Sequence, residues 1–528
     1  MLALEALTVG ELIKRSAARF RHCRAVWYEG DVWNYEQLDE ITDDIAAALV
    51  GIGIGKGKHV GVFGEIEAET LFVFYALQKL GAVTVMINTS LEKEELLQAI
   101  TMTDIEYLFV GASYKQDKNL CATCQEVSAL TSLKEIISVG KSVPGTFRTL
   151  KMLMKAPALT RTDLFQMYAK VKPMDTAVIL FTSGSTSKPK AVMSSHYSRV
   201  NSGIQQADDL RADCKDLFCV AMPMFHCFCI SANLLAALSA GACLCIPQDR
   251  HTHSILKTVS TCGCTVLSCV PTMFYAMMGK KDFSSAAVKS LRTGIIGGAY
   301  YPPEEFVRIE KTLGFTLLSS LGQTECTAGI TVCGMDDSLE VRSRTVGHFM
   351  SHVEGKIADL KTGMILPIGV QGEICVRGYV QMQGYYGRED LTQEVIDADG
   401  WLHTGDLGSM DNSGRITLAG RCKELIIRGG ENISPCEIEA VLSLLPQVKD
   451  CKAVGVPDSH YGEEICVCIS VNEGQTLDEK LVKEHISNHL AYYKIPRYVL
   501  FWDGFPCTCT QKIKTTETAL KAKRELGL

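Results

Sequence analysis

The feature that most constrains this fold is a regular alternation of strand-like and helix-like segments over roughly the first 420 residues. Residues 58–65 (KHVGVFGE) are a short apolar run typical of a buried strand. Residues 68–82 (AETLFVFYALQKLGA) have the length of a helix, and residues 83–88 (VTVMIN) are again strand-like. The same pattern returns later, with strand-like runs at residues 176–181, 217–223, 241–247 and 264–271. Strands that alternate with helices of this length predict βαβ units and largely parallel sheets.

The pattern changes near Ile357 to shorter strand-like segments and tight turns. Examples are residues 372–378 (GEICVRG) and the turn at residues 411–414, which precedes residues 415–420 (RITLAG). Segments of this kind indicate an antiparallel or barrel-like part. We therefore expect a second, differently built region after the parallel sheets.

A further boundary is predicted near Arg421, after which about a hundred residues have their own strands and helices. Residues 434–437 (SPCE) have the pattern of a capping box and predict a helix that runs to Leu445. We expect an α/β protein with an N-terminal domain of residues 1–421 and a small α+β C-terminal domain of residues 422–528.

Composition and charge exclude several classes of function. The 528 residues carry 53 Lys and Arg against 60 Asp and Glu, a formal net charge of −7, which argues against a nucleic-acid-binding protein. The best candidate for a membrane span, residues 71–87, contains Gln78 and Lys79 and is predicted to be a buried helix followed by a strand. The N-terminus lacks the pattern of a secretory signal. We expect a cytoplasmic enzyme without a transmembrane segment.

The 22 cysteines favour neither a zinc site nor a disulfide framework. Cys121 and Cys124 form the single C-x-x-C pair, and a structural zinc site needs a second pair. Half of the other cysteines occur as C-x-C, with examples in apolar runs such as residues 465–471 (ICVCISV). Alternate residues of a strand share one face, so these are predicted to be small buried hydrophobic residues of a reduced protein.

The most specific local signal is residues 180–190 (LFTSGSTSKPK), which follow a strand-like run directly. Hydroxyl groups, backbone N–H groups freed by glycine, and two lysines together suit polyphosphate oxygens. Pro189 stands at the second-glycine position of a Walker A loop, so the segment is a different kind of phosphate loop. The chain also has no G-x-S-x-G nucleophile elbow, which argues against a serine hydrolase. Residues 191–193 read as a returning strand, with Ser194 or Ser195 capping a helix from His196.

Taken with the rest of the chain, this loop resembles the adenylate-forming superfamily, which includes acyl-CoA synthetases, luciferases and adenylation domains. The resemblance extends over nearly the whole chain, because further motifs follow in the order typical of the family. These are residues 223–226 (PMFH), 297–299 (GGA), 321–325 (LGQTE), 385–386 (YY), 400–406 (GWLHTGD), 420–424 (GRCKE) and 429–433 (GGENI). Lys512 falls where the family places a C-terminal catalytic lysine.

The resemblance implies a large N-terminal domain of two αβ subdomains and a barrel-like part, with a mobile C-terminal domain that rotates about a hinge at Lys423. It also assigns roles to residues. The catalytic group would be Lys512, Thr324, Glu325 and His226. ATP would contact Thr182, Ser183, Gly184, Ser185, Thr186, Lys190, Gly297, Gly298, Ala299, Leu321, Gly322, Gln323, Asp406 and Arg421. Thr186 and Glu325 would hold Mg²⁺, and Gly429 and Gly430 would line the CoA tunnel.

The residue types suit these roles, although each has a plainer explanation when taken alone. Thr324 offers a hydroxyl to the α-phosphate and Glu325 a hard oxygen for Mg²⁺, but a Thr–Glu pair is commonly a helix N-terminus. Asp406 can accept both ribose hydroxyls, or merely form a turn. Arg421 suits ribose and phosphate oxygens, or a solvated surface. His226 and Lys512 are assigned by the resemblance alone.

The chain departs from the family pattern at a few positions. Leu321 stands where an aromatic residue usually stacks on adenine, so a contribution of about 1 kcal/mol is expected to be missing. Ser187 and Ala191 replace glycines of the phosphate loop, which would cost about 1 kcal/mol if either needed a positive φ. Gln511 replaces the glycine before the catalytic lysine, and Lys514 replaces an arginine.

The resemblance implies an AMP-forming acid–thiol ligase, namely an acyl-CoA synthetase. A carboxylate would attack the α-phosphate of Mg·ATP, and CoA would then attack the acyl-adenylate. Residues 227–244 are apolar and rich in Ala and Ser, which predicts a hydrophobic fatty or aryl acid. Three alternatives remain open at this point: a carrier-protein acceptor, a luciferase-like oxygenase, and a nucleotide-binding regulatory protein with weakened catalysis. A homodimer is compatible with the sequence.

Overall fold

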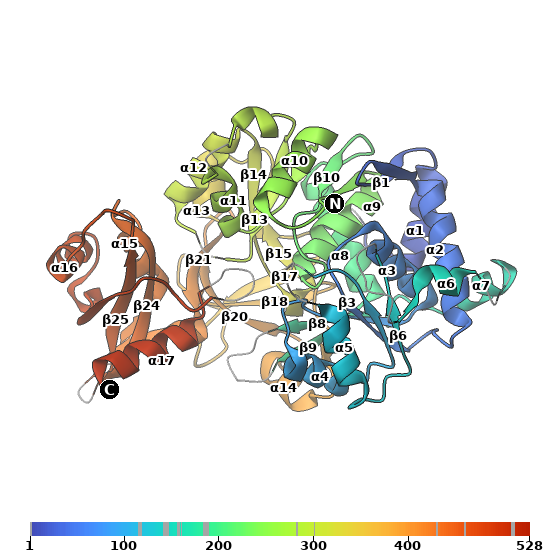
Figure 1. Cartoon of the computed structure of the whole chain (residues 1–528). Helices are drawn as coiled ribbons and strands as arrows, with labels where there is room; N and C mark the ends of the chain where they lie inside the picture. The colour runs from blue at the N-terminus through green and yellow to red at the C-terminus, as the bar shows by residue number, and fades with distance from the viewer. Residues whose placement is uncertain are drawn as a thin grey trace.

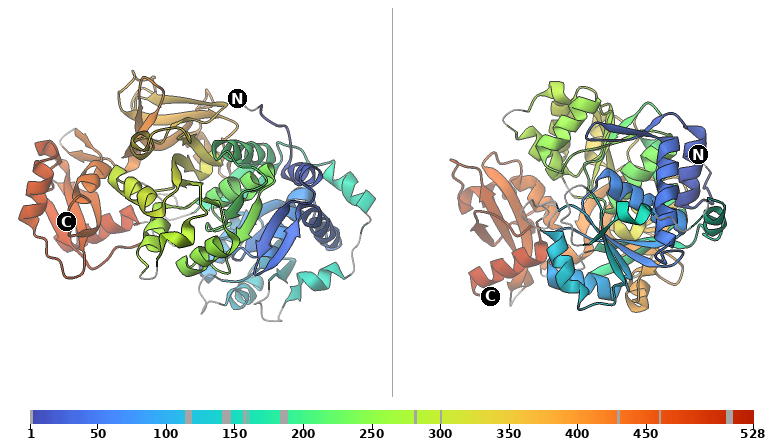
Figure 2. Two further views of the ribbon diagram at one scale, coloured as in Figure 1. Left: turned by 90° about the horizontal axis from the view of Figure 1, so that it is seen from above. Right: turned by 45° about the vertical axis from the view of Figure 1, so that its right-hand side comes forward.

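The computed structural model shows two αβ bodies beside an antiparallel sheet, with the C-terminal elements grouped to one side (Figure 1). The C-terminal group lies at one side of the molecule in both views of Figure 2. The structure describes every residue except 1–2, 114–118, 141–146, 156–158, 160, 183–188, 281–282, 300, 429–430, 459–460 and 508–512.

The first αβ sheet has the strand order β16-β15-β14-β13-β12-β10-β11-β1-β2. Its central strands are parallel, and β2, β15 and β16 are antiparallel to their neighbours at the two edges. The strands are β1 (Arg24–Tyr28), β2 (Asp31–Asn34), β10 (Leu217–Cys219), β11 (Cys243–Ile246), β12 (Val266–Leu267), β13 (Thr293–Gly297), β14 (Thr316–Gln323), β15 (Ala328–Val332) and β16 (His348–Phe349).

The second αβ sheet has the order β19-β9-β8-β4-β3-β5-β6-β7 and is parallel from β8 to β7. The strands β8 and β9 pair antiparallel, as the returning strand in the sequence predicts. The strands are β3 (His59–Phe63), β4 (Val83–Met86), β5 (Tyr107–Val110), β6 (Glu135–Ser138), β7 (Arg148–Thr149), β8 (Thr176–Thr182), β9 (Lys190–Ser195) and β19 (Gly384–Tyr385).

Two antiparallel regions follow. The sheet β17-β18-β20-β21 confirms the predicted change of pattern after the parallel sheets. The C-terminal sheet has the order β23-β22-β25-β24, with β26 parallel to β25. The strands are β17 (Val353–Ala358), β18 (Gly372–Gly378), β20 (Leu402–Met410), β21 (Ile416–Arg421), β22 (Ile426–Arg428), β23 (Glu431–Ile433), β24 (Val448–Asp458), β25 (Gly462–Val471) and β26 (Tyr498–Phe501). The boundary after Arg421 and the hinge at Lys423 remain predictions.

The α-helices pack on both αβ sheets and on the C-terminal sheet. They are α1 (Val9–Arg19), α2 (Tyr35–Val50), α3 (Ala68–Leu80), α4 (Lys93–Met102), α5 (Leu120–Ser128), α6 (Leu150–Met154), α7 (Arg161–Tyr168), α8 (His196–Asp209), α9 (Ala236–Ala240), α10 (Thr252–Cys262), α11 (Pro271–Met278), α12 (Pro303–Leu313), α13 (Leu339–Arg344), α14 (Glu389–Val395), α15 (Pro435–Leu442), α16 (Glu479–Ser487) and α17 (Thr515–Leu526). A π-helical segment at Cys229–Leu235 precedes α9, and short 3₁₀ turns include Thr324–Cys326 and Cys422–Glu424.

The main hydrophobic core lies between the two αβ sheets, where α3, α8 and the π-helical segment meet. Every residue of α3 except Glu69 is buried, which explains why its sequence is apolar on all sides. The helix ends at Gly81, whose φ of 68° is the left-handed conformation that glycine adopts readily. The prediction of a buried helix followed by a strand at residues 71–87 is confirmed. Ser195 caps α8 by accepting from the Ser198 amide, also as predicted.

The capping box predicted at Ser434 is wrong. The Ser434 hydroxyl donates to the Ala419 carbonyl of β21 instead of capping α15, and the Glu437 carboxylate pairs with Lys494. The helix also ends at Leu442, before the predicted Leu445. A local pattern failed here because partners from distant segments compete for the same side chains.

Asp209, at the C-terminal end of α8, provides a test of the pH dependence of folding. Gln205 Nε2 donates to its Oδ1 at 3.0 Å, and its Oδ2 is buried without a partner among the described groups. Burial raises the pKa of this carboxyl from 3.8 to about 7. The folded-state pKa therefore exceeds the unfolded one, so the stability contributed by the neutral carboxyl is complete below the unfolded pKa and is lost as the pH rises through the folded pKa.

We therefore expect Asp209→Asn, which keeps the shape but cannot ionise, to match the wild type near pH 4. At about pH 8 the variant should be more stable by roughly 1 kcal/mol or more. Chemical unfolding at the two pH values measures the difference. An equal difference in stability between variant and wild type at both pH values would contradict the raised pKa of Asp209.

Candidate active site

The centre of the candidate site is the turn that carries Thr324 and Glu325. This turn follows β14 directly and leads into β15, so the β14–β15 pairing holds it in place. Gly322 permits the close approach of the two strands, because a Cβ there would lie 1.7 Å from the Ala328 carbonyl oxygen. Thr327 closes the turn with a φ of 62°, and its hydroxyl donates to the Val380 carbonyl at 2.7 Å.

Glu325 is held by residues of the other αβ sheet. The Tyr385 hydroxyl of β19 donates to Glu325 Oε1 at 2.9 Å, and the Met382 amide donates to the Glu325 carbonyl at 2.8 Å. The Lys190 ammonium of β9 lies 4.7 Å from the centre of the Tyr385 ring, a cation–π contact on the residue that holds Glu325. Burial, and then the Glu325 charge, raise the pKa of Tyr385, so its hydroxyl stays protonated and donates.

Thr324 faces the segment that contains His226. Its hydroxyl donates to the Cys227 thiol at 3.7 Å, and this thiol lies 4.0 Å from Nδ1 of His226. The predicted catalytic residues Thr324, Glu325 and His226 therefore lie together, although they come from separate elements.

Asp406 and Arg421 form an ion pair between β20 and β21. The Arg421 Nε atom lies 2.9 Å from Asp406 Oδ1, and the Asp406 side chain is only 7% exposed. The Asp406 charge, and further away those of Glu424 and Glu325, raise the pKa of Arg421. Asp406 therefore presents a buried, charge-paired carboxylate at the end of its turn.

The turn before Asp406 is fixed by a set of residues that the sequence did not single out. His403 Nδ1 lies 2.7 Å from Glu373 Oε2, and Glu373 Oε1 accepts from the Gly405 amide at 2.9 Å. Cys375 Sγ lies 3.5 Å from the same His403 nitrogen. Glu373, Cys375 and His403 form the one group in the described part of the chain with the composition and spacing to hold a metal ion. Its hydrogen bonds assign it to positioning the Asp406 turn.

A small cavity of about 40 Å³ opens beside the Thr324 turn. It lies between α8, the segment after β10, and the ends of β13, β14 and β15. Gly298 forms part of its wall with a φ of 82°, a conformation that favours glycine. The lining residues are Gln206, His226, Cys227, Phe228, Ile295, Gly297, Gly298, Ser320, Gly322, Ala328 and Gly329.

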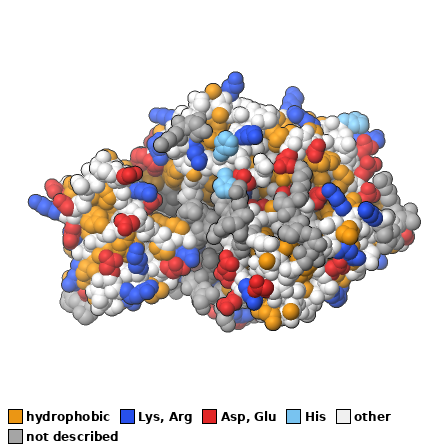
Figure 3. Space-filling model, in the orientation of Figure 1, with side chains coloured by type: hydrophobic (Ala, Val, Ile, Leu, Met, Phe, Trp, Pro, Cys, Tyr) orange, Lys and Arg blue, Asp and Glu red, His pale blue; other side chains and the backbone are white. Residues whose placement is uncertain are grey.

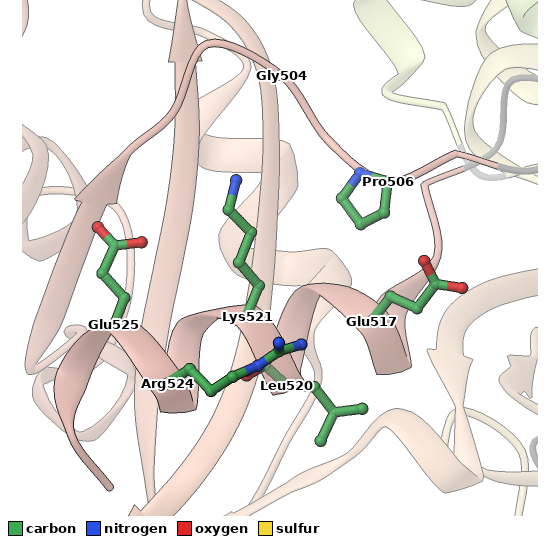
Figure 4. Close-up of a pocket in the computed structure, with 7 residues that line it drawn as sticks. All are labelled: Gly504, Pro506, Glu517, Leu520, Lys521, Arg524 and Glu525. Carbon is green, nitrogen blue, oxygen red and sulfur yellow. The ribbon is translucent and has the colours of Figure 1, made fainter.

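A larger hollow lies on the C-terminal sheet, away from these residues. It is an open groove of about 820 Å³ between α17 and the loop after β26, shown in Figure 4. Glu517, Leu520, Lys521, Arg524 and Glu525 of α17 face it, together with Gly504 and Pro506. None of the predicted site residues is among the described residues that line it.

Several predicted site residues lie outside the described residues and stay predictions. They are Ser183, Gly184, Ser185, Thr186, Gly429, Gly430 and Lys512, together with the departures Ser187 and Gln511. Two predicted ATP ligands flank residues 183–188 of the phosphate loop. They are Thr182 and Lys190, which face each other as partners of the β8–β9 hairpin. Gln323 Nε2 donates to Cys326 Sγ at 3.7 Å, and Ala299 follows Gly298 after β13.

The described departures from the family pattern fit the fold. Ala191 lies in β9 and has no positive φ, so its methyl group causes no backbone strain. Leu321 is 8% exposed and belongs to an apolar cluster that includes Val192 and Tyr385. Lys514 pairs with Glu517 at 2.7 Å. Neither Tyr385 as a partner of Glu325 nor Arg199 beneath the Thr324 turn was predicted, because no local pattern links residues so far apart.

Comparison with known families decides the identity. The family model of the AMP-binding enzyme matches residues 13–386, and that of the AMP-binding enzyme C-terminal domain matches residues 437–512. The chain belongs to the adenylate-forming AMP-binding enzymes. It is 35% identical to the Bacillus subtilis protein YngI, which carries the name of an acyl-CoA synthetase, over 96% of this chain and 95% of that protein. It is 31% identical to the mitochondrial medium-chain acyl-CoA ligase ACSF2 of Danio rerio, over 99% of this chain and 90% of that protein.

Solved structures show the same fold. The anthranilate CoA ligase AuaEII, in complex with anthranoyl-AMP, has a TM-score of 0.88 at 23% identity and covers 100% of this chain and 99% of its own. ATP-bound MatB from Rhodopseudomonas palustris has a TM-score of 0.85 at 24% identity and covers 98% of this chain and 100% of its own. The α/β fold with a large N-terminal and a small C-terminal part is therefore confirmed.

These comparisons identify the chain as an AMP-forming acid–thiol ligase of the acyl-CoA synthetase group, a family that uses ATP and CoA. No helix in the described segments is long and apolar enough to cross a membrane. On the face in Figure 3, the described basic and acidic side chains are intermixed rather than gathered into one basic surface.

Proposed function

We propose that this protein joins a hydrophobic fatty or aryl acid to CoA, through an acyl-adenylate, with release of AMP and diphosphate. The observation that carries the proposal is the meeting of separate motifs at the Thr324 turn. Tyr385 of one αβ sheet, with Lys190 over its ring, reaches Glu325, while the His226 segment of the other reaches Thr324. The small cavity opens at the same turn.

In the first half-reaction, negative charge builds on the α-phosphate and on the departing diphosphate. The Thr324 hydroxyl and the Lys190 ammonium would stabilise this charge, with Lys512 as a further cation by resemblance. Asp406 would accept the ribose hydroxyls, and Arg421 would neutralise Asp406 until the nucleotide binds. The adenine would lie near Gly297, Gly298 and Leu321.

Glu325 fits a role as ligand for Mg²⁺. Its carboxylate is partly exposed, Tyr385 fixes one of its oxygens, and carboxylate oxygen is the ligand type that this ion prefers. Thr186 would be the second protein ligand. When bound, the ion would neutralise charge on the phosphate oxygens.

For the second half-reaction we propose that the C-terminal domain rotates about Lys423. The rotation would remove Lys512 and bring Gly429 and Gly430 beside a path for the pantetheine of CoA. Lys423 lies in the exposed 3₁₀ turn Cys422–Glu424, between the last strand of the third sheet and the first strand of the C-terminal sheet. A short exposed connection of this kind can absorb a change in backbone angles.

The cavity supports a hydrophobic acid. Its described lining contains no Asp, Glu, Lys or Arg side chain that could recognise a second charged group. Its volume of about 40 Å³ admits only a small group, so a chain or ring requires side chains such as Phe228 to rotate. The medium-chain ligase among the relatives supports a fatty acid of intermediate length.

Acid-dependent exchange between ATP and diphosphate tests this proposal. Across straight-chain acids from acetate upward, and benzoate, we expect kcat/KM to rise about threefold to fourfold per added methylene until the pocket is full. This follows because each buried CH₂ contributes about 0.8 kcal/mol. A kcat/KM for acetate equal to that for the longer and aromatic acids would contradict the hydrophobic pocket. The absence of exchange with every acid in the panel would contradict catalysis by adenylation.

A further inference from the structure

The thiol of Cys227 lines the acyl cavity but has no part in the adenylation chemistry. The residue is 4% exposed and follows His226 directly. Cys229, two residues further on, starts the π-helical segment and is fully buried. Both cysteines belong to the main core, but Cys229 is not among the described residues that line the cavity. The two cysteines therefore differ in what surrounds them, although both were predicted to be buried hydrophobic residues.

Two polar groups contact the Cys227 thiol. The Thr324 hydroxyl donates to Sγ at 3.7 Å, and Nδ1 of His226 lies 4.0 Å from Sγ. Nδ1 of His226 accepts a hydrogen bond from the Phe228 amide at 3.3 Å, so this nitrogen carries a lone pair rather than a proton. A thiol beside an unprotonated imidazole nitrogen has a base to receive its proton.

A buried cation lies beneath the same group. Arg199 of α8 is fully buried, and none of its described contacts is to a carboxylate. Its Nε donates to Ser194 Oγ at 2.8 Å, its Nη1 donates to the Thr327 carbonyl at 2.8 Å, and its Nη2 has no partner in the part of the protein that the structure describes. A guanidinium placed in this way has an uncompensated positive charge directed at its surroundings.

The electrostatics of the two cysteines reflect this difference. Burial alone would raise the pKa of the Cys227 thiol, but His226, Arg199 and the Thr324 hydroxyl together hold it below its ordinary value. Burial raises the pKa of Cys229 well above that value. Nucleophilic cysteines occur in electropositive surroundings like those of Cys227, whereas cysteines buried among apolar groups, like Cys229, are inert.

We propose that Cys227 is a site of covalent modification in the acyl cavity, alkylated by carboxylic acids that carry a halide on carbon 2. The inference rests on the proposed function, since it takes the cavity as the acyl site. The thiol gives its proton to a base, the sulfur forms a bond to carbon 2, and the carbon–halogen bond breaks with the halide leaving as an anion. No oxidant or further reactant is needed.

The position of the thiol explains the choice of carbon 2. The Thr324 hydroxyl, predicted to contact the α-phosphate, lies within hydrogen-bonding range of Sγ. An acid whose carboxylate points at this phosphate therefore places its first carbons, and not its far end, beside Cys227. Binding in the cavity would raise the local concentration of the electrophile at the sulfur.

The experiment treats the full-length protein with 2-bromohexanoate, or with the matching amide, which has the same electrophile but no carboxylate. Digestion and mass spectrometry then follow the adduct on the peptide that contains Cys227. We expect the ratio of the acid rate to the amide rate to be about tenfold higher at Cys227 than at the exposed Cys214. Saturating ATP, Mg²⁺ and hexanoate should slow the reaction by a similar factor. Cys214, which is exposed, serves as the internal control, because its ratio of acid to amide rates reports the intrinsic reactivity of the two electrophiles. The substrates should not slow its reaction.

Two variants complete the test. Cys214→Ser should leave the modification rate at Cys227 and the catalytic activity unchanged. Cys227→Ser should abolish the cavity adduct, and the variant's remaining exchange activity should resist the bromo acid. A ratio of acid to amide rates at Cys227 equal to the ratio at Cys214, or modification of Cys229 in place of Cys227, would overturn the inference. Because the adduct is read by mass, its absence in a protein that still performs acid-dependent exchange rejects this inference and leaves the proposed function intact.

Discussion

Lys512→Ala is expected to slow acid-dependent adenylation by a factor of about 10²–10³, the usual effect of removing a group that stabilises charge in the transition state. By resemblance, Lys512 neutralises the departing diphosphate, and this charge develops only in the first half-reaction. Conversion of supplied acyl-AMP and CoA into thioester should therefore continue in the variant. Gly430→Leu should do the reverse, because a bulky side chain would obstruct the pantetheine path while exchange between ATP and diphosphate proceeds.

Lys514→Ala is the matched control for this pair of variants. It removes a lysine two positions away, whose ammonium pairs with Glu517 at 2.7 Å. Adenylation should change by no more than about twofold, because an exposed ion pair of this kind contributes little. If Lys512→Ala and Gly430→Leu depress both half-reactions equally, while circular dichroism shows folded protein, the rotating-domain proposal fails.

Gly322→Ala is expected to destabilise the protein by about 3 kcal/mol, at the upper end of the cost of overpacking, since the obstacle is backbone rather than a movable side chain. The new Cβ would lie 1.7 Å from the Ala328 carbonyl oxygen and 2.6 Å from its carbon. To relieve this contact, β14 and β15 must separate at the point where they hold the Thr324 turn. The apparent melting temperature and the exchange activity should therefore fall together.

Gly504→Ala is the control for added volume. Its Cβ would meet nothing within 4 Å, and the residue has no positive φ. We expect a change in stability of no more than about 0.5 kcal/mol. A melting temperature for Gly322→Ala equal to that of Gly504→Ala would show that the β14–β15 contact is not as close as described.

Much of the local structure could be predicted from the sequence. The buried character of α3, the end of this helix at Gly81, the β8–β9 hairpin and the capping of α8 by Ser195 depend on patterns of a few consecutive residues. Errors arose where a distant group competes for a side chain. Ser434 failed as a helix cap because the Ala419 carbonyl of β21 receives its hydroxyl.

The candidate site also combines features that the sequence predicts with contacts that it could not predict. By resemblance, the residue types and their order predict nucleotide roles for Thr324, Glu325, Asp406 and Arg421 without a structure. The sequence could not indicate that Tyr385 orients Glu325, that Arg199 lies beneath the Thr324 turn, or that Cys227 faces Thr324. These pairs are separated by 60 residues for Tyr385–Glu325, 128 for Arg199–Thr327 and 97 for Cys227–Thr324.

The alternation of strands and helices and the family follow from the sequence alone, and the sequence also predicts which chemical groups are offered to ATP. All of these are encoded in local periodicity and in short motifs whose residue types are required by the chemistry. The tertiary structure alone decided which side chains meet, and with that the different surroundings of Cys227 and Cys229. Such contacts depend on strand register and on the packing of α8 between two sheets, because a shift of one residue would turn each side chain to the opposite face.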